Sequence, residues 1–133
     1  MHILAIDDEP DILFIVKAAV EESGDHTVVV SGAAEEALEL AASERPDGIL
    51  MDVSMPTMDG YAALRRLRSD HRTSNIPVIF LTARAREEDI AGGIALGAAG
   101  HITKPFNPCL LTQRLCELIE AAPNGTPPDS PLG

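Results

Sequence analysis

The segment that decides the fold is residues 48–60, which read GILMDVSMPTMDG. Its apolar start, residues 49–51, is typical of a strand that is covered on both faces. Asp52 stands at the carboxyl end of this strand, and a loop with Pro56 and Gly60 leads into a helical pattern. Sites in open parallel sheets lie beyond the carboxyl ends of the strands, so Asp52 stands where chemistry is expected. Taken alone, the segment leaves open that Asp52 only ends the strand or caps the following turn.

The composition is that of one globular domain with an aliphatic core. The chain has 133 residues, of which 45% are hydrophobic and only 3% aromatic, so Ala, Val, Ile and Leu must fill the core. The formal net charge of −11 argues against nucleic-acid binding through this domain. Binding is driven by basic side chains that displace counterions from the phosphates, and an acidic domain would displace few of them. Carboxylates that gather in one place need a cation to offset their repulsion.

The cysteines and the hydropathy pattern predict a cytoplasmic protein. Cys109 and Cys116 fall on one predicted helix, with backbones about 10 Å apart at a rise of 1.5 Å per residue, too far for a disulfide. Unpaired thiols are typical of a reducing compartment. We expect no membrane contact, since no signal peptide opens the chain and no apolar run is long enough to cross a bilayer.

Apolar segments and helical patterns alternate five times along the chain. This alternation predicts an α/β fold with a parallel sheet covered by helices on both faces. Pro10 and Pro108 suit first helical turns, with Ser31 and Asn107 as expected N-caps of the second and last helices. The strands are expected over residues 2–6, 27–30, 49–52, 76–82 and 99–103, and a helix follows each of them.

Two of these helices have features of their own. The arginines of the helix over residues 59–69 are expected on its solvent face. The helix over residues 87–96 contains Gly92 and Gly93, and each Gly costs roughly 1 kcal/mol relative to Ala. We therefore expect that helix to have low stability. We also expect its conformation to differ more than that of any other element between two states of the protein.

Polar side chains stand at the carboxyl ends of four of the predicted strands. They are Asp7 and Asp8 just after the first strand, Asp52 at the end of the third, Thr82 at the end of the fourth and Lys104 just after the fifth. The carboxyl ends of parallel strands meet at one edge, so these side chains should converge there. Three carboxylates with open water positions suit Mg²⁺ or Mn²⁺. A carboxylate can also attack phosphorus, with a metal ion, an ammonium group and a hydroxyl to stabilise the phosphoryl oxygens.

Each acidic residue also has a plainer interpretation. The run Asp7-Asp8-Glu9 precedes a helix, and the helix macrodipole favours negative charge there. That effect accounts for one or two carboxylates more readily than for three adjacent ones.

Four segments resemble the receiver domain of two-component response regulators. They read IDDEP at residues 6–10, MDVSMPTMDG at 51–60, LTA at 81–83 and ITKPF at 102–106. The resemblance implies a flavodoxin-like, doubly wound, five-stranded parallel sheet of order 2-1-3-4-5 with five helices. The receiver domain would span residues 1–121, and the Pro- and Gly-rich residues 122–133 would form a flexible tail or linker.

The resemblance also implies a metal site. Asp8 would bind Mg²⁺ directly and Asp7 largely through water. Asp52 and the backbone carbonyl of Ser54 would complete the protein ligands.

For the phosphoryl group, the resemblance makes Asp52 the phosphoacceptor. Thr82 would bond the phosphoryl oxygen and move with it. Lys104 would pair with the phosphoryl group, or with Asp52 beforehand, and the Lys104–Pro105 peptide would be cis.

The chain departs from the family at three positions. His101 stands where the family usually has Tyr or Phe, an aromatic residue that swings inward as the threonine moves. One hypothesis makes His101 a rotameric switch whose outward state is favoured by protonation; the alternative is an exposed histidine at a partner-binding face. Ser54 and Arg84 flank the site, where such residues modulate the access of water to the aspartyl phosphate. Arg84 either shields the phosphoryl group or is simply solvated.

The resemblance implies signal relay rather than enzyme activity. A histidine kinase or histidine phosphotransfer protein would phosphorylate Asp52, and the change would spread to the fourth helix, fifth strand and fifth helix, with a phosphorylation-dependent dimer left open. A phosphohydrolase of the haloacid dehalogenase type also uses an aspartyl phosphate, but it needs a second Asp where this chain has Ser54. A degenerate receiver, acting as an unphosphorylated interaction module, is the other alternative.

Overall fold

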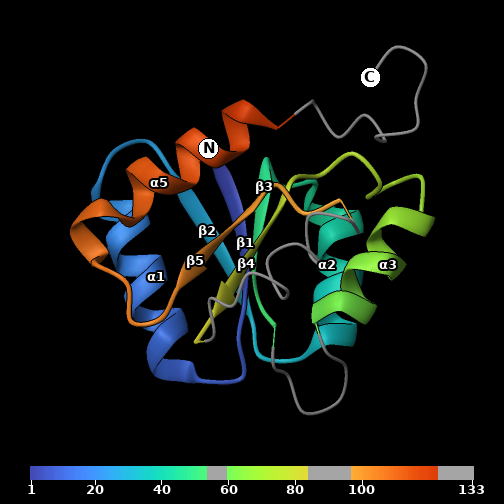
Figure 1. The fold of residues 1–133 in the computed structure, drawn as a ribbon, viewed down its shortest axis with the longest axis horizontal. Coiled ribbons are helices and arrows are strands. Elements are labelled where there is room, and N and C mark those ends of the chain that lie inside the picture. The colour runs from blue at the N-terminus through green and yellow to red at the C-terminus, as the bar shows by residue number, and fades with distance from the viewer. Residues whose placement is uncertain (54–59, 84–96, 123–133) are drawn as a thin grey trace.

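Five parallel strands form a single sheet with the order β2-β1-β3-β4-β5. The computed structural model describes residues 1–53, 60–83 and 97–122 (Figure 1). This arrangement confirms the expected doubly wound sheet, while the helix expected over residues 87–96 lies outside the described residues. The strands are β1 His2–Ile6, β2 Thr27–Ser31, β3 Gly48–Asp52, β4 Val78–Thr82 and β5 Gly100–Thr103; the described helices are α1 Pro10–Glu22, α2 Ala34–Glu44, α3 Gly60–Ser69 and α5 Pro108–Ala121.

The register of the sheet brings the polar strand ends to one level. Ile6 pairs with Met51, so Asp7 comes level with Asp52. Asp52 in turn pairs with Leu81, and Thr82 pairs with Thr103, the residue before Lys104. The polar residues at the carboxyl ends of β1, β3, β4 and β5 therefore meet at the same edge.

Helices cover both faces of the sheet. Figure 1 shows α1 and α5 on one side and α2 and α3 on the other. Aliphatic residues of the strands alternate between two cores, as the two-residue period of a strand requires. The α1/α5 core contains Ile3, Leu50, Ile79 and Leu115, and the α2/α3 core contains Leu4, Met51, Leu64 and Phe80.

Proline and asparagine start two helices as expected, whereas the expected serine cap is wrong. Pro10 is the first residue of α1, and the Asn107 side chain accepts a hydrogen bond from the backbone N–H of Cys109 at the start of α5. The N-cap of α2 is Ala33, which makes no side-chain cap. Ser31 lies two residues earlier, and its Oγ donates a hydrogen bond to Glu36 Oε1 at 2.9 Å instead.

The strand expected over residues 76–82 begins later, at Val78. The backbone N–H of Ile76 donates a hydrogen bond to Thr73 O at 3.1 Å, so this residue closes a turn rather than pairing with the sheet. Pro77 has no N–H to give to a ladder, but its carbonyl accepts from Ile49 N at 2.9 Å. The turn and the proline together delay the strand.

Side chains of α1 cover part of the free edge of β2. The odd-numbered residues of β2 bond to β1, as Thr27 N does to Met1 O, so the peptide groups of Val28 point away from the sheet. Val28 N donates to Glu21 Oε2 at 3.1 Å, and Lys17 Nζ donates to Val28 O at 2.9 Å. Lys17 and Glu21 also pair with each other at 2.9 Å.

Across the described parts of the chain, no helix combines the length and apolar character that crossing a bilayer requires.

Candidate functional site

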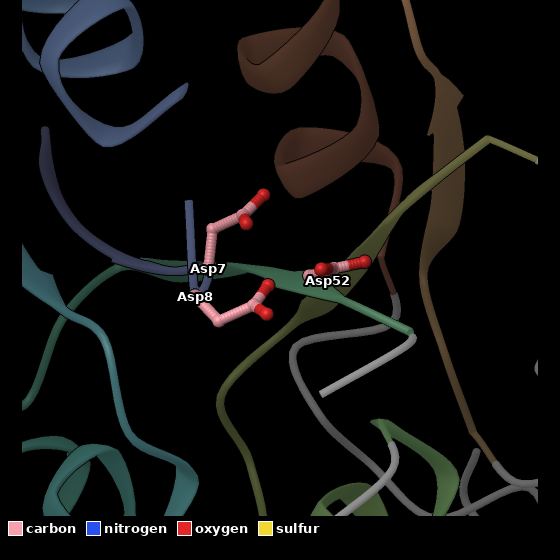
Figure 2. Close-up of side chains that lie close together, drawn as sticks. All are labelled: Asp7, Asp8 and Asp52. Atoms are coloured by element: carbon pink, nitrogen blue, oxygen red, sulfur yellow. The ribbon is translucent and has the colours of Figure 1, made fainter. Parts of the chain in front are cut away.

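Three carboxylates meet at the edge that the register defines. Asp7 and Asp8 follow β1, Asp52 is the last residue of β3, and each offers an oxygen within 4.8 Å of the others (Figure 2). Asp7 and Asp52 are buried, with 1% and 5% of their surface exposed, whereas Asp8 is open to solvent. Buried carboxylates this close repel one another strongly, so the site requires positive charge.

The two oxygens of Asp7 have different surroundings. Oδ1 accepts a hydrogen bond from the backbone N–H of Glu9 at 2.9 Å. Oδ2 lies 2.8 Å from Lys104 Nζ, which makes an ion pair. Within the described residues, however, no donor approaches this buried oxygen with hydrogen-bond geometry. It is therefore a polar atom that still has room for a better-placed partner.

Lys104 brings the only lysine charge at this edge of the described chain. Its backbone N–H donates to Thr82 O at 2.7 Å, and the following peptide bond, to Pro105, is cis. Nζ lies 2.8 Å from Asp7 Oδ2, 3.4 Å from Glu9 Oε1 and 3.6 Å from Asp52 Oδ2. Burial alone would lower the pKa of Lys104, but the contact with Asp7 and the charges of Asp52, Asp7 and Glu9 outweigh it and raise the pKa. The ammonium group therefore stays charged, as the carboxylates require.

This arrangement fits a hard divalent cation. The donors are carboxylate oxygens, two of them on buried side chains held by strand ends. The exposed position of Asp8 leaves one side of the cluster open to water. Mg²⁺ and Mn²⁺ prefer oxygen ligands and keep several waters, so the cluster suits either ion.

The other predicted site residues are placed as follows. Thr82 ends β4 one residue beyond the partner of Asp52, and its carbonyl is tied to Lys104. His101 is half-buried in β5 and pairs with Phe80. Ser54 and Arg84 lie outside the described residues.

Sequence reasoning missed the place of Glu9 in the site. It treated Glu9 only as the third residue of an acidic run, whereas the side chain reaches Lys104. A local signal for this exists in Pro10, because a residue before proline is driven into extended backbone. Glu9 has φ −97° and ψ 108°, so the chain does not continue α1 backwards through Glu9.

A sequence model of one family, described as the response regulator receiver domain, matches residues 3–116. The chain belongs to the response regulator receiver family. Receiver domains are signalling modules of two-component systems, and the motif segments at residues 6–10, 51–60, 81–83 and 102–106 all lie inside the match.

A curated relative of this receiver domain is the response regulator Rre1 of Synechocystis, which is 39% identical over 108 residues. Those residues are 81% of this chain and 47% of that protein. The chain thus spans about half the length of several curated relatives that it matches.

Solved structures share the receiver fold. The chemotaxis protein CheY4 of Vibrio cholerae has a TM-score of 0.83 and 32% identity, covering 88% of this chain and 97% of that one. The receiver domain of the sensor histidine kinase PA1611 from Pseudomonas aeruginosa has a TM-score of 0.79 and 30% identity, covering 90% and 98%. The PA1611 structure holds a magnesium ion coordinated in its active-site cleft.

Proposed function

We propose that this receiver domain accepts a phosphoryl group on Asp52 from a phosphohistidine of a histidine kinase or a histidine phosphotransfer protein. The observation that carries the proposal is the meeting of Asp7, Asp8 and Asp52 within 4.8 Å, with Lys104 Nζ 3.6 Å from Asp52 Oδ2. A nucleophilic carboxylate with positive charge beside it is the arrangement that phosphoryl transfer needs.

The transfer is a single displacement at phosphorus. One oxygen of Asp52 forms the new O–P bond while the P–N bond to the donor's imidazole breaks. The imidazole leaves with the bonding electron pair and takes one proton from water. Lys104 lies close enough to Asp52 to neutralise the charge that the phosphoryl oxygens bring to the site.

The carboxylates of Asp7, Asp8 and Asp52 would hold Mg²⁺ or Mn²⁺, and the backbone carbonyl of Ser54 is the fourth protein ligand that we propose. When bound, the ion supplies positive charge to the phosphoryl oxygens. The protein itself fixes the positions of the carboxylate ligands. Strand β3 fixes Asp52, and the Glu9 N–H bond to Asp7 fixes the orientation of that carboxylate.

The signal would leave the site through β4 and β5. We propose that the Thr82 hydroxyl bonds the phosphoryl group and moves with it. The Thr82 carbonyl accepts from Lys104 N at 2.7 Å, so a shift of Thr82 is passed to the start of the segment that leads into α5. The proposed change is a population shift between two states of one fold, which would be read out on β5, α5 and the helix expected over residues 87–96, outside the described residues.

His101 keeps its two interpretations within this proposal. It lies in β5 on the proposed output face and is half-buried. If it is a protonation-dependent switch, a His101→Phe variant should lose the pH dependence of signalling output. If it is a partner-binding histidine, the variant should keep that pH dependence and bind the partner less tightly.

The domain is proposed to span residues 1–121, followed by a tail or linker over 122–133. We also predict that the domain can self-associate on phosphorylation, which light scattering of the phosphorylated protein would test.

The test is intact mass after incubation with acetyl phosphate and Mg²⁺. We expect one added phosphoryl group on the parent and none on Asp52→Asn. Asp47→Asn is the matched control, because Asp47 precedes the same strand at its other end and is exposed; this variant should be phosphorylated like the parent.

A folded parent that takes up no phosphate, from acetyl phosphate or from a set of histidine kinases, would contradict the proposal. The degenerate receiver, an interaction module without phosphorylation, would then replace it.

A further inference from the structure

We infer that Glu9 is a positioning residue for Lys104, and that it holds the ammonium group at the site when a cation occupies the carboxylates. This inference deepens the proposed function and rests on it. Glu9 would act without binding the metal ion or the phosphoryl group.

Glu9 contacts the site twice, through different atoms. Its backbone N–H donates to Asp7 Oδ1 at 2.9 Å. Its side-chain Oε1 accepts a hydrogen bond from Lys104 Nζ at 3.4 Å. One residue therefore orients a carboxylate of the metal cluster and also holds the lysine that lies next to that cluster.

The backbone keeps Glu9 where both contacts are made. Glu9 is the N-cap of α1, in extended conformation, and Pro10 fixes the first residue of the helix. The N–H bond to Asp7 closes a short turn between residues 7 and 9. The side chain of Glu9 thus starts from a defined position, although 61% of it is exposed.

The three carboxylates around Lys104 are not equivalent. Asp7 and Asp52 belong to the cluster that suits a divalent cation, whereas Glu9 does not. A divalent ion on that cluster offsets the charge of Asp7 and Asp52, and it repels the ammonium group. Of the three acidic partners of Lys104 in the described chain, Glu9 is the one that keeps its full charge for the lysine.

A physical readout of this role is the mobility of the Lys104 side chain. The chain contains two lysines, Lys17 and Lys104, so ¹³Cε relaxation of lysine-labelled protein reports two resolvable groups. Lys17 pairs with Glu21 one turn later in α1, away from the end of the helix that Glu9 caps. Lys17 therefore serves as an internal reference.

We expect an effect that depends on both the substitution and the metal ion. In the parent, Lys104 should stay ordered with and without Mg²⁺. In Glu9→Gln it should stay ordered without Mg²⁺, because Asp7 and Asp52 still hold it, and become mobile at saturating Mg²⁺. The matched variant Glu21→Gln should loosen Lys17 alone, at any Mg²⁺ concentration. A Lys104 that stays ordered in Glu9→Gln with Mg²⁺, or that is already mobile in the parent with Mg²⁺, overturns the inference.

Phosphorylation by acetyl phosphate gives the second readout. At saturating Mg²⁺, Glu9→Gln should be phosphorylated about 2- to 5-fold more slowly than the parent, as expected for loss of a partly exposed ion pair. Glu9→Asp, which keeps the charge, should recover part of the rate. The Mg²⁺ dissociation constant, measured by Mn²⁺ competition, should change by about twofold or less, since the Glu9 side chain is largely exposed and screened. A rate that returns to the parent value when Mg²⁺ is raised would show that Glu9 acts only on metal affinity, which contradicts a positioning role.

The two proposals fail in different ways. If the parent takes no phosphoryl group, the proposed function fails, and the relaxation experiment still decides whether Glu9 holds Lys104. If the parent is phosphorylated but Glu9→Gln behaves like it in both readouts, only the inference on Glu9 fails.

Discussion

The ammonium group of Lys104 lies closer to Asp7 than to any other carboxylate of the described chain, with 2.8 Å between Nζ and Oδ2. The phosphoacceptor candidate Asp52 is 3.6 Å away. In this structure, then, one lysine charge is shared between two buried carboxylates. The pair with Asp52 was expected from the sequence. The shorter contact with Asp7 was not expected, and it arises because the segments that follow β1 and β5 bring the two side chains together.

Removing this charge should destabilise the domain without a metal ion. Lys104→Gln leaves Asp7 and Asp52 buried without compensation, and loss of one partner of a buried ion pair costs about 3 kcal/mol. Urea unfolding at pH 7 measures this loss. Saturating Mg²⁺ should return most of it, since the ion takes over the compensation. Lys17→Gln, an exposed control, should lose far less, and an equal loss in both variants would contradict the assignment.

Acid should remove the contribution of Glu21. The hydrogen bonds from Lys17 and from the Val28 backbone lower the pKa of Glu21. A carboxyl group whose pKa is lowered by folding stabilises the protein above its unfolded pKa, near 4.5, and that stability is lost as the pH falls through the folded value. Glu21→Gln should therefore be less stable than the parent at pH 7 and similar to it near pH 2.

Urea unfolding at several pH values checks this prediction. Glu22→Gln is the control, since Glu22 is exposed and adjacent in the same helix, and its difference from the parent should be small throughout. A Glu21→Gln difference that does not shrink in acid would show that the contacts of Glu21 are not electrostatic.

Two glycines should differ in their tolerance of a methyl group. A Cβ at Gly60 would lie 2.9 Å from Val53 Cα and 3.1 Å from Asp52 O, both backbone atoms. A Cβ at Gly48 would meet only side-chain atoms of Ile119 and Ile3, and side chains move more easily than backbone. Gly60→Ala should cost about 2–3 kcal/mol and Gly48→Ala about 1–2 kcal/mol, within the range for overpacked cores.

Chemical unfolding of both variants tests this order. Gly60→Ala should also weaken Mg²⁺ binding, because the contact falls on the backbone of the candidate metal ligand Asp52. Equal metal affinity in the two variants would contradict the link between Gly60 and the site.

Arg68 should matter more than its neighbours on α3. It donates to Ile76 O at 2.8 Å through one nitrogen and to Gly97 O at 3.0 Å through the other, and its burial lowers the pKa of the guanidinium group. Arg68→Ala leaves both carbonyls without this donor and should cost about 2 kcal/mol, as for hydrogen bonds to charged groups. Arg65→Ala, at an exposed position of the same helix, should lie within about 0.5 kcal/mol of the parent.

The sequence predicted the sheet and the site edge because both depend on local patterns. Apolar runs defined the strands. The geometry of any parallel sheet then placed the residues at their carboxyl ends, such as Asp7, Asp52 and Lys104. The start of α1 at Pro10 and the cap at Asn107 are likewise local. These features can be predicted without knowing how the helices pack on the sheet.

What the sequence missed depends on tertiary contacts. The arginines of α3 were all expected in solvent, but the fold brings two backbone carbonyls to Arg68, one from the loop after α3 and one from Gly97. Ser31 has a side chain suited to capping a helix. However, Gly32 and Ala33 extend the loop, so α2 begins at Ala34 and Ser31 is too far from its first turn to cap it. The contact between Glu9 and Lys104 joins residues that are 95 positions apart in the sequence, and no local sequence pattern predicts such a pair.

The covering of β2 by Lys17 and Glu21 has a consequence for the behaviour of the protein in concentrated solution. An exposed edge strand is a template on which a second chain can add a strand and begin aggregation. Here the outward N–H and C=O of Val28 are already bonded to side chains of α1, and a charged pair lies across the approach. The sheet therefore resists growth at its β2 edge by means of its own first helix, and acid that protonates Glu21 weakens that resistance.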